Sequence, residues 1–124
     1  RWGDATNYTQ IDGDGIISFG GAGRVTPHYS SETQNASATF TVSKTYTRCN
    51  STTTGAMTAN LPTASGIAGR VYAVKKIDSS GNAVTLDADG SETIDGAGTY
   101  ALTAQWNSVT IISNGTNWEI LSTT

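Results

Sequence analysis

Charged residues are scarce in this chain of 124 residues, at 14% against about 25% in typical soluble domains. Hydrophobic residues reach only 36%, and Ser, Thr, Gly and Asn fill the difference. An intrinsically disordered chain carries more net charge and fewer aromatic residues than this one. We therefore expect a folded chain whose surface consists mainly of hydroxyl and amide groups, as in extracellular β-proteins that pack against neighbours.

Cysteine and histidine are almost absent. A single cysteine, Cys49, excludes an internal disulfide, and one histidine, His28, with one cysteine cannot build a closed zinc site in a single chain. No nucleophile motif surrounds His28, which argues against a Ser-His-Asp triad. We predict that Cys49 is a buried small apolar residue rather than a reactive thiol, and we expect no cofactor and no bound metal.

Basic residues are too few and too scattered for nucleic-acid binding. The chain has seven of them, its net charge is −3, and Lys75-Lys76 is the only adjacent pair. Attraction to phosphates requires a basic patch. No apolar run approaches the roughly 18 residues that a membrane helix needs. The sequence therefore predicts neither a nucleic-acid partner nor membrane insertion.

Helical periodicity is missing as well. No window has apolar residues at i, i+3, i+4 and i+7 over three turns, and Gly interrupts nearly every candidate. Residues 70–121 instead read as short strands separated by polar turns. The pattern predicts an all-β fold, an antiparallel β-sandwich or jelly-roll-like domain built from short hairpins. One domain is expected over residues 1–124, with residues 1–35 as a candidate extended segment for assembly or attachment.

The clearest hairpin signal is Asn114-Gly115, a pair that accepts positive φ in a two-residue type I′ turn. Such a turn places Ile111 opposite Trp118 on the two flanking strands. Because side chains alternate along a strand, the sequence predicts one core face for this hairpin. Its members are Val109, Ile111, Trp118 and Ile120.

Further strands are predicted upstream by the same reasoning. Residues 79–82 are expected to form a hairpin loop between two paired strands, because Ser, Gly and Asn favour turns. The alternating segment 37–42 is expected to be a strand that pairs with residues 45–49. Residues 8–19 predict two short strands joined through residues 12–15.

Two acidic motifs invite a functional interpretation, and turn geometry is the better account of both. Asp12-Gly13-Asp14-Gly15 resembles the middle of a calcium loop, but Gln10 and Gly21 stand where such a loop has two of its ligands. The second motif invites a comparison with the paired carboxylates of glycoside hydrolases, yet acids beside Gly or Ser at strand ends satisfy backbone N–H groups. Its residues are Asp87, Asp89, Glu92 and Asp95. We predict no catalytic residue and no enzyme activity.

The string TASGIAGRVYAVKKIDSSGNAVTLDADGSETIDGAGTYALTAQWNSVTIISNGTNWEI, residues 63–120, resembles a module of bacteriophage tail fibres and related virion appendage proteins, such as head fibres and decoration proteins. Its KKIDSSGNAVT, ETIDGA and SNGTNW motifs carry the resemblance. The resemblance implies a non-enzymatic structural protein at the virion surface, extracellular, often trimeric, with other virion proteins and a host-surface glycan as partners. It brings no catalytic residue.

Self-assembly is also expected from the composition. A small β-domain with short strands, few charges and no protective edge lysines has apolar patches that neighbouring subunits would cover. We therefore expect a symmetric homo-oligomer, a trimer. The candidate interface residues, each with the core as its alternative place, are Tyr72, Val74, Ile112 and Leu121.

Two alternative functions come from other classes. In the first, the chain is a carbohydrate-binding module, and Trp106 is the candidate sugar-stacking platform because an indole is both flat and amphipathic. In the second, the chain is a subunit of an extracellular filament, in which the N-terminal segment completes the sheet of a neighbour by strand exchange.

Overall fold

Strands are the only regular elements in the described part of the chain. The computed structural model describes residues 8–11, 17–20 and 29–124. Within these ranges the protein is all-β, as predicted. The strands are β1 (Tyr8–Ile11), β2 (Ile17–Gly20), β3 (Ser31–Gln34), β4 (Thr39–Thr41), β5 (Tyr46–Cys49), β6 (Met57–Asn60), β7 (Val71–Lys76), β8 (Val84–Asp87), β9 (Thr99–Leu102), β10 (Ser108–Ser113) and β11 (Trp118–Thr123).

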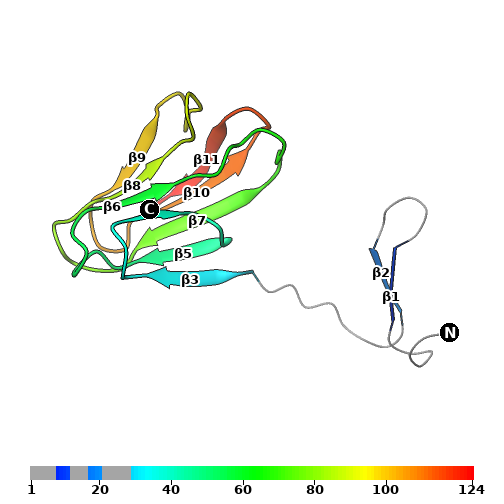
Figure 1. The fold of residues 1–124 in the computed structure, drawn as a ribbon, viewed down its shortest axis with the longest axis horizontal. Coiled ribbons are helices and arrows are strands. Elements are labelled where there is room, and N and C mark those ends of the chain that lie inside the picture. The colour runs from blue at the N-terminus through cyan, green and yellow to red at the C-terminus, as the bar shows by residue number, and fades with distance from the viewer. Residues whose placement is uncertain (1–7, 12–16, 21–28) are drawn as a thin grey trace.

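A five-stranded sheet and a four-stranded sheet pack as a sandwich, which confirms the predicted β-sandwich (Figure 1). The strand orders are β11-β10-β7-β5-β3 and β4-β6-β8-β9. Burial alternates along the strands of both sheets, so each sheet turns one face toward the other. The core between them includes Cys49, Met57, Leu86, Leu102, Val109, Ile111 and Trp118.

The prediction of antiparallel sheets built from hairpins was wrong, because both sheets are mixed. β3, β5 and β7 run parallel to one another, and so do β4, β6 and β8. Parallel neighbours cannot be joined by a tight turn, so from β3 to β8 the chain crosses to the opposite sheet after every strand. The chain therefore follows a short superhelical path with two strands per turn, one in each sheet, and we call this path the coil. Antiparallel pairing joins β8 to β9, β7 to β10 and β10 to β11.

Two predicted pairings were wrong for this reason. Residues 79–82 lie in the crossover from β7 to β8, which belong to different sheets, and do not form a hairpin loop. β5 pairs with β3 and β7 rather than with β4. Alternating apolar residues identify a strand, but they do not say which of two sheets it joins.

The β10-β11 hairpin has a loop of residues 114–117 instead of the predicted two-residue turn. Asn114 Oδ1 accepts hydrogen bonds from the backbone N–H groups of Thr116 and Asn117, both at 2.9 Å. Gly115 has a φ of 93°, a conformation that favours glycine. The Asn-Gly pair therefore located the turn correctly, but the loop is longer than predicted.

The longer loop shifts the register of the hairpin. Ile111 lies opposite Ile120, and Ser113 rather than Ile111 lies opposite Trp118. Up to the bulge at Leu121 the shift is two residues, which leaves each side chain on its face of the sheet, so the core-face prediction holds despite the wrong register. Ile111 and Trp118 are fully buried.

The N-terminal region contributes a separate pair of strands. β1 and β2 form a two-stranded antiparallel sheet, which confirms the two short strands predicted within residues 8–19. Residues 12–15 with the calcium-like motif, and His28, lie outside the described residues. β3 belongs to the five-stranded sheet, so residues 31–34 of the candidate attachment segment 1–35 are part of the sandwich.

Candidate functional site

A buried lysine lies between the sheets at the end of β7. Lys76 is 0% exposed, and its Nζ donates hydrogen bonds to Asp78 Oδ1 at 2.7 Å and to Ser51 Oγ at 3.1 Å. Ser80 Oγ accepts a third, at 3.3 Å. Within the described residues the Lys76–Asp78 contact is the only ion pair. A charge in this position requires such partners because its desolvation is costly.

Asp78 connects this lysine to two loops. Its carboxylate accepts hydrogen bonds from the backbone N–H groups of Ser51, at 2.8 Å, and Ser80, at 2.9 Å. Burial raises the pKa of Asp78, but the hydrogen bonds from Lys76, Ser80 and Ser51 outweigh it and hold the pKa well below its usual range. Ser51 follows β5 and Ser80 follows β7, so these four residues, which we call the crossover network, tie together two successive turns of the coil.

The sequence reasoning missed the crossover network, although the sequence contains a signal for it. Tyr72 and Val74 are inward positions of β7, and alternation then puts Lys76 inward too. Asp78, only two residues further on, supplies the opposite charge. Lys75-Lys76 was interpreted only as an adjacent basic pair.

The four candidate interface residues divide between core and surface. Tyr72 and Val74 are 5% and 0% exposed, so both are core residues, the alternative to an interface position that the sequence left open. Ile112 is half-buried on the outer face of β10. Leu121 is 57% exposed and sits at a β-bulge, where β11 has one residue more than β10. The fold therefore leaves Ile112 and Leu121 accessible to another subunit.

Trp106 is exposed on a fixed backbone in the loop between β9 and β10. Its side chain is 56% exposed, and its φ of 69° is rare for a bulky residue. The Trp106 N–H donates to the carbonyl of Lys76 at 2.8 Å, and the Trp106 carbonyl accepts from Thr124 Oγ1 at 3.2 Å. Lys75 Nζ lies 5.6 Å from the ring centroid, within the range of a cation–π contact.

Lys75 lies beside Trp106 on the outer face of the five-stranded sheet, and Arg48 is the next residue across that face. The register places Arg48 of β5 next to Lys75 of β7, and Lys75 next to Ser108 of β10. Burial alternates along β5 and β7, so Arg48 and Lys75 point away from the core. Adjacent strands are about 4.8 Å apart, so the two residues are side by side on the same face of the sheet. We call Trp106, Lys75 and Arg48 the basic aromatic patch.

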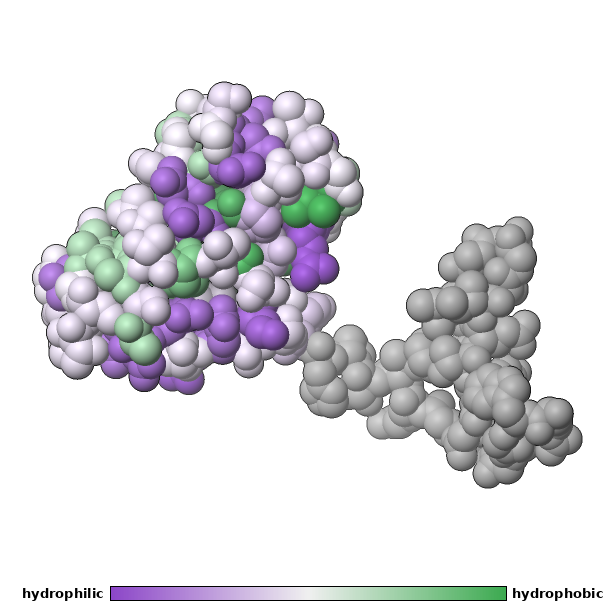
Figure 2. Space-filling model, viewed as in Figure 1, coloured by the Kyte–Doolittle hydropathy of each residue, from purple (hydrophilic) through white to green (hydrophobic). Residues whose placement is uncertain are grey.

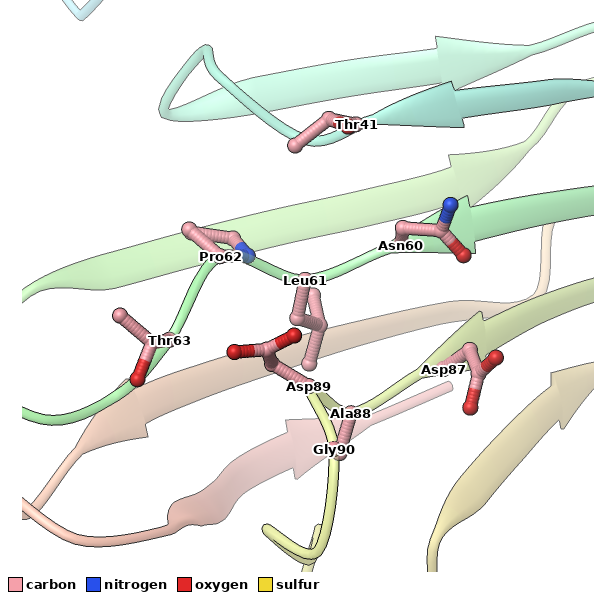
Figure 3. Close-up of a pocket in the computed structure, with 9 residues that line it drawn as sticks. All are labelled: Thr41, Asn60, Leu61, Pro62, Thr63, Asp87, Ala88, Asp89 and Gly90. Carbon is pink, nitrogen blue, oxygen red and sulfur yellow. The ribbon is translucent and has the colours of Figure 1, made fainter.

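An open pocket of about 410 Å³ lies where β4, β6 and β8 end (Figure 3). Because these strands are parallel, their carboxyl ends lie at the same end of the sheet. The last residues of the three strands are Thr41, Asn60 and Asp87. Asp89 lies on the loop that follows. The carboxylates of Asp87 and Asp89 point in different directions in Figure 3 and do not form a facing pair. The pocket lining is polar at this end and contains no aromatic side chain.

The other two residues of the acidic motif accept hydrogen bonds from distant segments of the chain. Glu92 accepts hydrogen bonds from the Ala64 N–H at 2.8 Å and the Thr63 hydroxyl at 2.7 Å. Burial raises the pKa of Glu92, and these hydrogen bonds lower it by more, so the pKa lies below its ordinary value. Asp95 Oδ1 accepts from the Ile120 N–H at 3.1 Å. Both acids thus satisfy backbone N–H groups, as predicted, but those of segments far away in the sequence rather than of their own turns.

Cys49 is fully buried, which confirms its prediction as a core residue. Burial raises the pKa of its thiol to about 12, together with the nearby carboxylates of Glu32 and Asp78. A thiol with such a pKa is not a nucleophile at neutral pH.

Metal ligands do not cluster in the part of the chain that the structure describes, because no three His, Cys, Asp or Glu side chains come together there. The same residues contain no helix long and apolar enough to cross a membrane.

No protein-family model matches the chain, and no curated protein matches it significantly. The fold and the site define an all-β sandwich with a buried polar network and an exposed basic aromatic patch.

Proposed function

We propose that this chain is a non-enzymatic structural protein of a bacteriophage particle surface or appendage (a tail fibre, head fibre or decoration protein) that assembles as a homotrimer. The resemblance of residues 63–120 supports the virion role. The observation that carries self-assembly is a pair of open edges. Among the described strands, β3 and β4, which form the first turn of the coil, each have a partner on one side only. Open edges present unpaired N–H and C=O groups, and neither strand contains Lys or Pro.

Apolar side chains on the outer surface give a second support. Ile112 lies beside Val71 in the register of β10 and β7, and both are half-buried on the outer face. Leu121 is exposed nearby on β11. Figure 2 shows that, on one face of the described body, hydrophobic residues form small areas separated by hydrophilic ones. A closed symmetric oligomer would bury such areas against identical copies.

The assembly proposal predicts the behaviour of two charged variants. Leu121→Asp and Ile112→Asp place a carboxylate on the proposed interface, where an unpaired charge is costly to bury. We expect each variant to dissociate to a monomer at concentrations where the native protein is a trimer. Sedimentation velocity measures the change directly.

The matched control is Thr85→Asp, a half-buried position on the outer face of the four-stranded sheet. It adds the same charge away from Ile112 and Leu121 and should leave the trimer intact. Trimers of unchanged stability in both interface variants would contradict the assignment of these residues to the interface.

The carbohydrate-binding alternative is favoured by Trp106. Few surface positions of the described chain present so large an apolar side chain, and the backbone that carries it is held by hydrogen bonds on both sides. A sugar ring binds to a flat aromatic face of this kind through its C–H groups. On a virion appendage, such a site would serve the recognition of a host-surface glycan.

The filament alternative is favoured by the N-terminal strands. β1 and β2 pair only with each other among the described strands, and a lone two-stranded hairpin has marginal stability in water. Pairing with an open edge of a neighbouring copy, such as β3, would complete a larger sheet. This arrangement predicts an open polymer that is lost when residues 1–19 are removed.

A further inference from the structure

The cations of the basic aromatic patch form no ion pair with any residue that the structure describes. Arg48 and Lys75 are nearest neighbours in the register of β5 and β7, and both point to solvent. Among the described residues the one salt bridge joins Lys76 to Asp78, on the inner side of the sheet. Two adjacent cations without a bound carboxylate repel each other, so an anion that binds between them is stabilised by both.

The backbone that carries the indole of the patch is held in place before any ligand arrives. Trp106 keeps a φ of 69°, which is strained for a bulky side chain, and strained residues persist only where the surrounding structure fixes them. Asn107 fixes the loop: its Oδ1 accepts from the Ala104 N–H at 2.9 Å, and its Nδ2 donates to the Thr124 carbonyl at 3.0 Å. Gln105 Nε2 adds a hydrogen bond to the Ile77 carbonyl at 3.1 Å. A fixed aromatic face binds a ligand with little loss of conformational entropy.

We propose that the basic aromatic patch binds an acidic carbohydrate, with a sugar ring stacked on the exposed part of the Trp106 indole and its carboxylate bound by Lys75 and Arg48. This inference rests on the carbohydrate-binding candidate function and adds the class of sugar. The Lys75 ammonium lies 5.6 Å from the indole centroid, so one ligand ring can contact both groups. The protein has a net charge of −3, so attraction of an anion depends on this patch rather than on the whole surface.

The other candidate sites of the molecule fit this ligand less well. The pocket at the ends of β4, β6 and β8 contains Asp87 and Asp89, which repel a carboxylate. Lys76, Asp78 and Ser51 of the crossover network are buried, and their groups already have partners. The basic aromatic patch combines an exposed aromatic face with unpaired positive charge.

The test titrates the 124-residue protein with a galacturonic acid oligomer and with a neutral galactose oligomer of the same length, followed by tryptophan fluorescence and calorimetry. We expect the acidic oligomer to bind about tenfold more tightly at low salt, which is the size of one charge-assisted hydrogen bond. High salt should remove most of this difference, because the patch is solvent-exposed.

Three variants assign the contacts. Trp106→Gly removes the indole without backbone strain, because glycine adopts positive φ freely, and should abolish binding of both oligomers. Lys75→Gln and Arg48→Gln should each weaken binding of the acidic oligomer about threefold, together removing the tenfold preference, and leave the neutral one unchanged. Arg70→Gln is the control, since Arg70 lies over the Tyr72 ring, 5.3 Å from its centroid, and should change neither affinity.

The outcomes separate this inference from the function on which it rests. Equal affinity for both oligomers would overturn the acidic class and leave the carbohydrate function standing. Binding of neither oligomer by the native protein would overturn both. Tighter binding of single-stranded DNA than of the acidic oligomer, with the same loss in Trp106→Gly, would assign the patch to nucleic acid and overturn the proposal.

Discussion

Replacing Asp78 by Asn should lower the free energy of unfolding by about 3–5 kcal/mol, because the charge of Lys76 then stays buried without a counter-charge. Asn has nearly the shape of Asp but lacks its charge and has a single acceptor oxygen, so the hydrogen bonds from Ser51 and Ser80 are also weakened. Urea unfolding of the native and variant proteins measures the change.

A double-mutant cycle isolates the ion pair from the rest of the crossover network. Lys76→Met with Asp78→Asn should be more stable than Asp78→Asn alone, because the unpaired charge is gone. Asp87→Asn is the matched control at a half-buried position without an ion pair, and it should cost less than about 0.5 kcal/mol. A cost for Asp78→Asn as small as this control would contradict the structural role of the network.

Asp78 also sets part of the acid sensitivity of the fold. Its folded-state pKa lies below that of the unfolded chain, which is about 3.9 for Asp. The stabilisation is therefore complete above about pH 4 and is lost as the pH falls through the lower folded-state pKa. Asp78→Asn lacks this contribution at every pH, so its stability should decline less than that of the native protein below pH 4.

Replacing Trp118 by Ala should cost about 3–5 kcal/mol of unfolding free energy, the usual range for a fully buried tryptophan. The ring packs against Tyr72 with centroids 5.6 Å apart. The backbone of Trp118 also anchors the loop between β8 and β9, because its N–H donates to the Thr93 carbonyl at 2.8 Å. The cavity would therefore open where this loop meets β11.

Trp118→Phe separates ring packing from the indole N–H. Trp118 Nε1 is buried and has no hydrogen-bond partner among the described residues, so removing it relieves an unsatisfied donor and offsets part of the lost contact area. We expect the Phe variant to be much more stable than the Ala variant. Thermal and urea unfolding measure both variants. If Trp118→Phe loses as much unfolding free energy as Trp118→Ala, the N–H and not ring packing dominates at this position.

Local sequence patterns predicted the elements of this fold but not their pairing. Alternation identified the inward residues of β10 and β11, and Asn114-Gly115 located their turn. The same pattern could not distinguish a hairpin from a crossover at residues 79–82, because turn-forming residues suit both. At this crossover Lys76 contacts Asp78 and also Ser51 from another turn of the coil, a long-range contact that a local pattern does not reveal.

The surface features were predicted in part. Trp106 was a candidate for exposure, but its positive φ and its contact with Lys75 depend on the loop hydrogen bonds of Asn107. The proximity of Arg48 to Lys75 follows from the parallel pairing of β5 with β7, which no local pattern reveals. Tyr72 and Ile112 both lie on strands with alternating apolar residues, and only the packing of the two sheets decides which one is buried.

The most direct test of the assembly proposal is the solution mass of the native 124-residue protein, measured by analytical ultracentrifugation over a range of concentrations. The account predicts a closed trimer of 12.9 kDa chains whose mass does not grow with concentration. A mass that keeps growing with concentration would contradict closed symmetry and favour strand exchange through β1 and β2. A monomer at every concentration would contradict self-assembly itself.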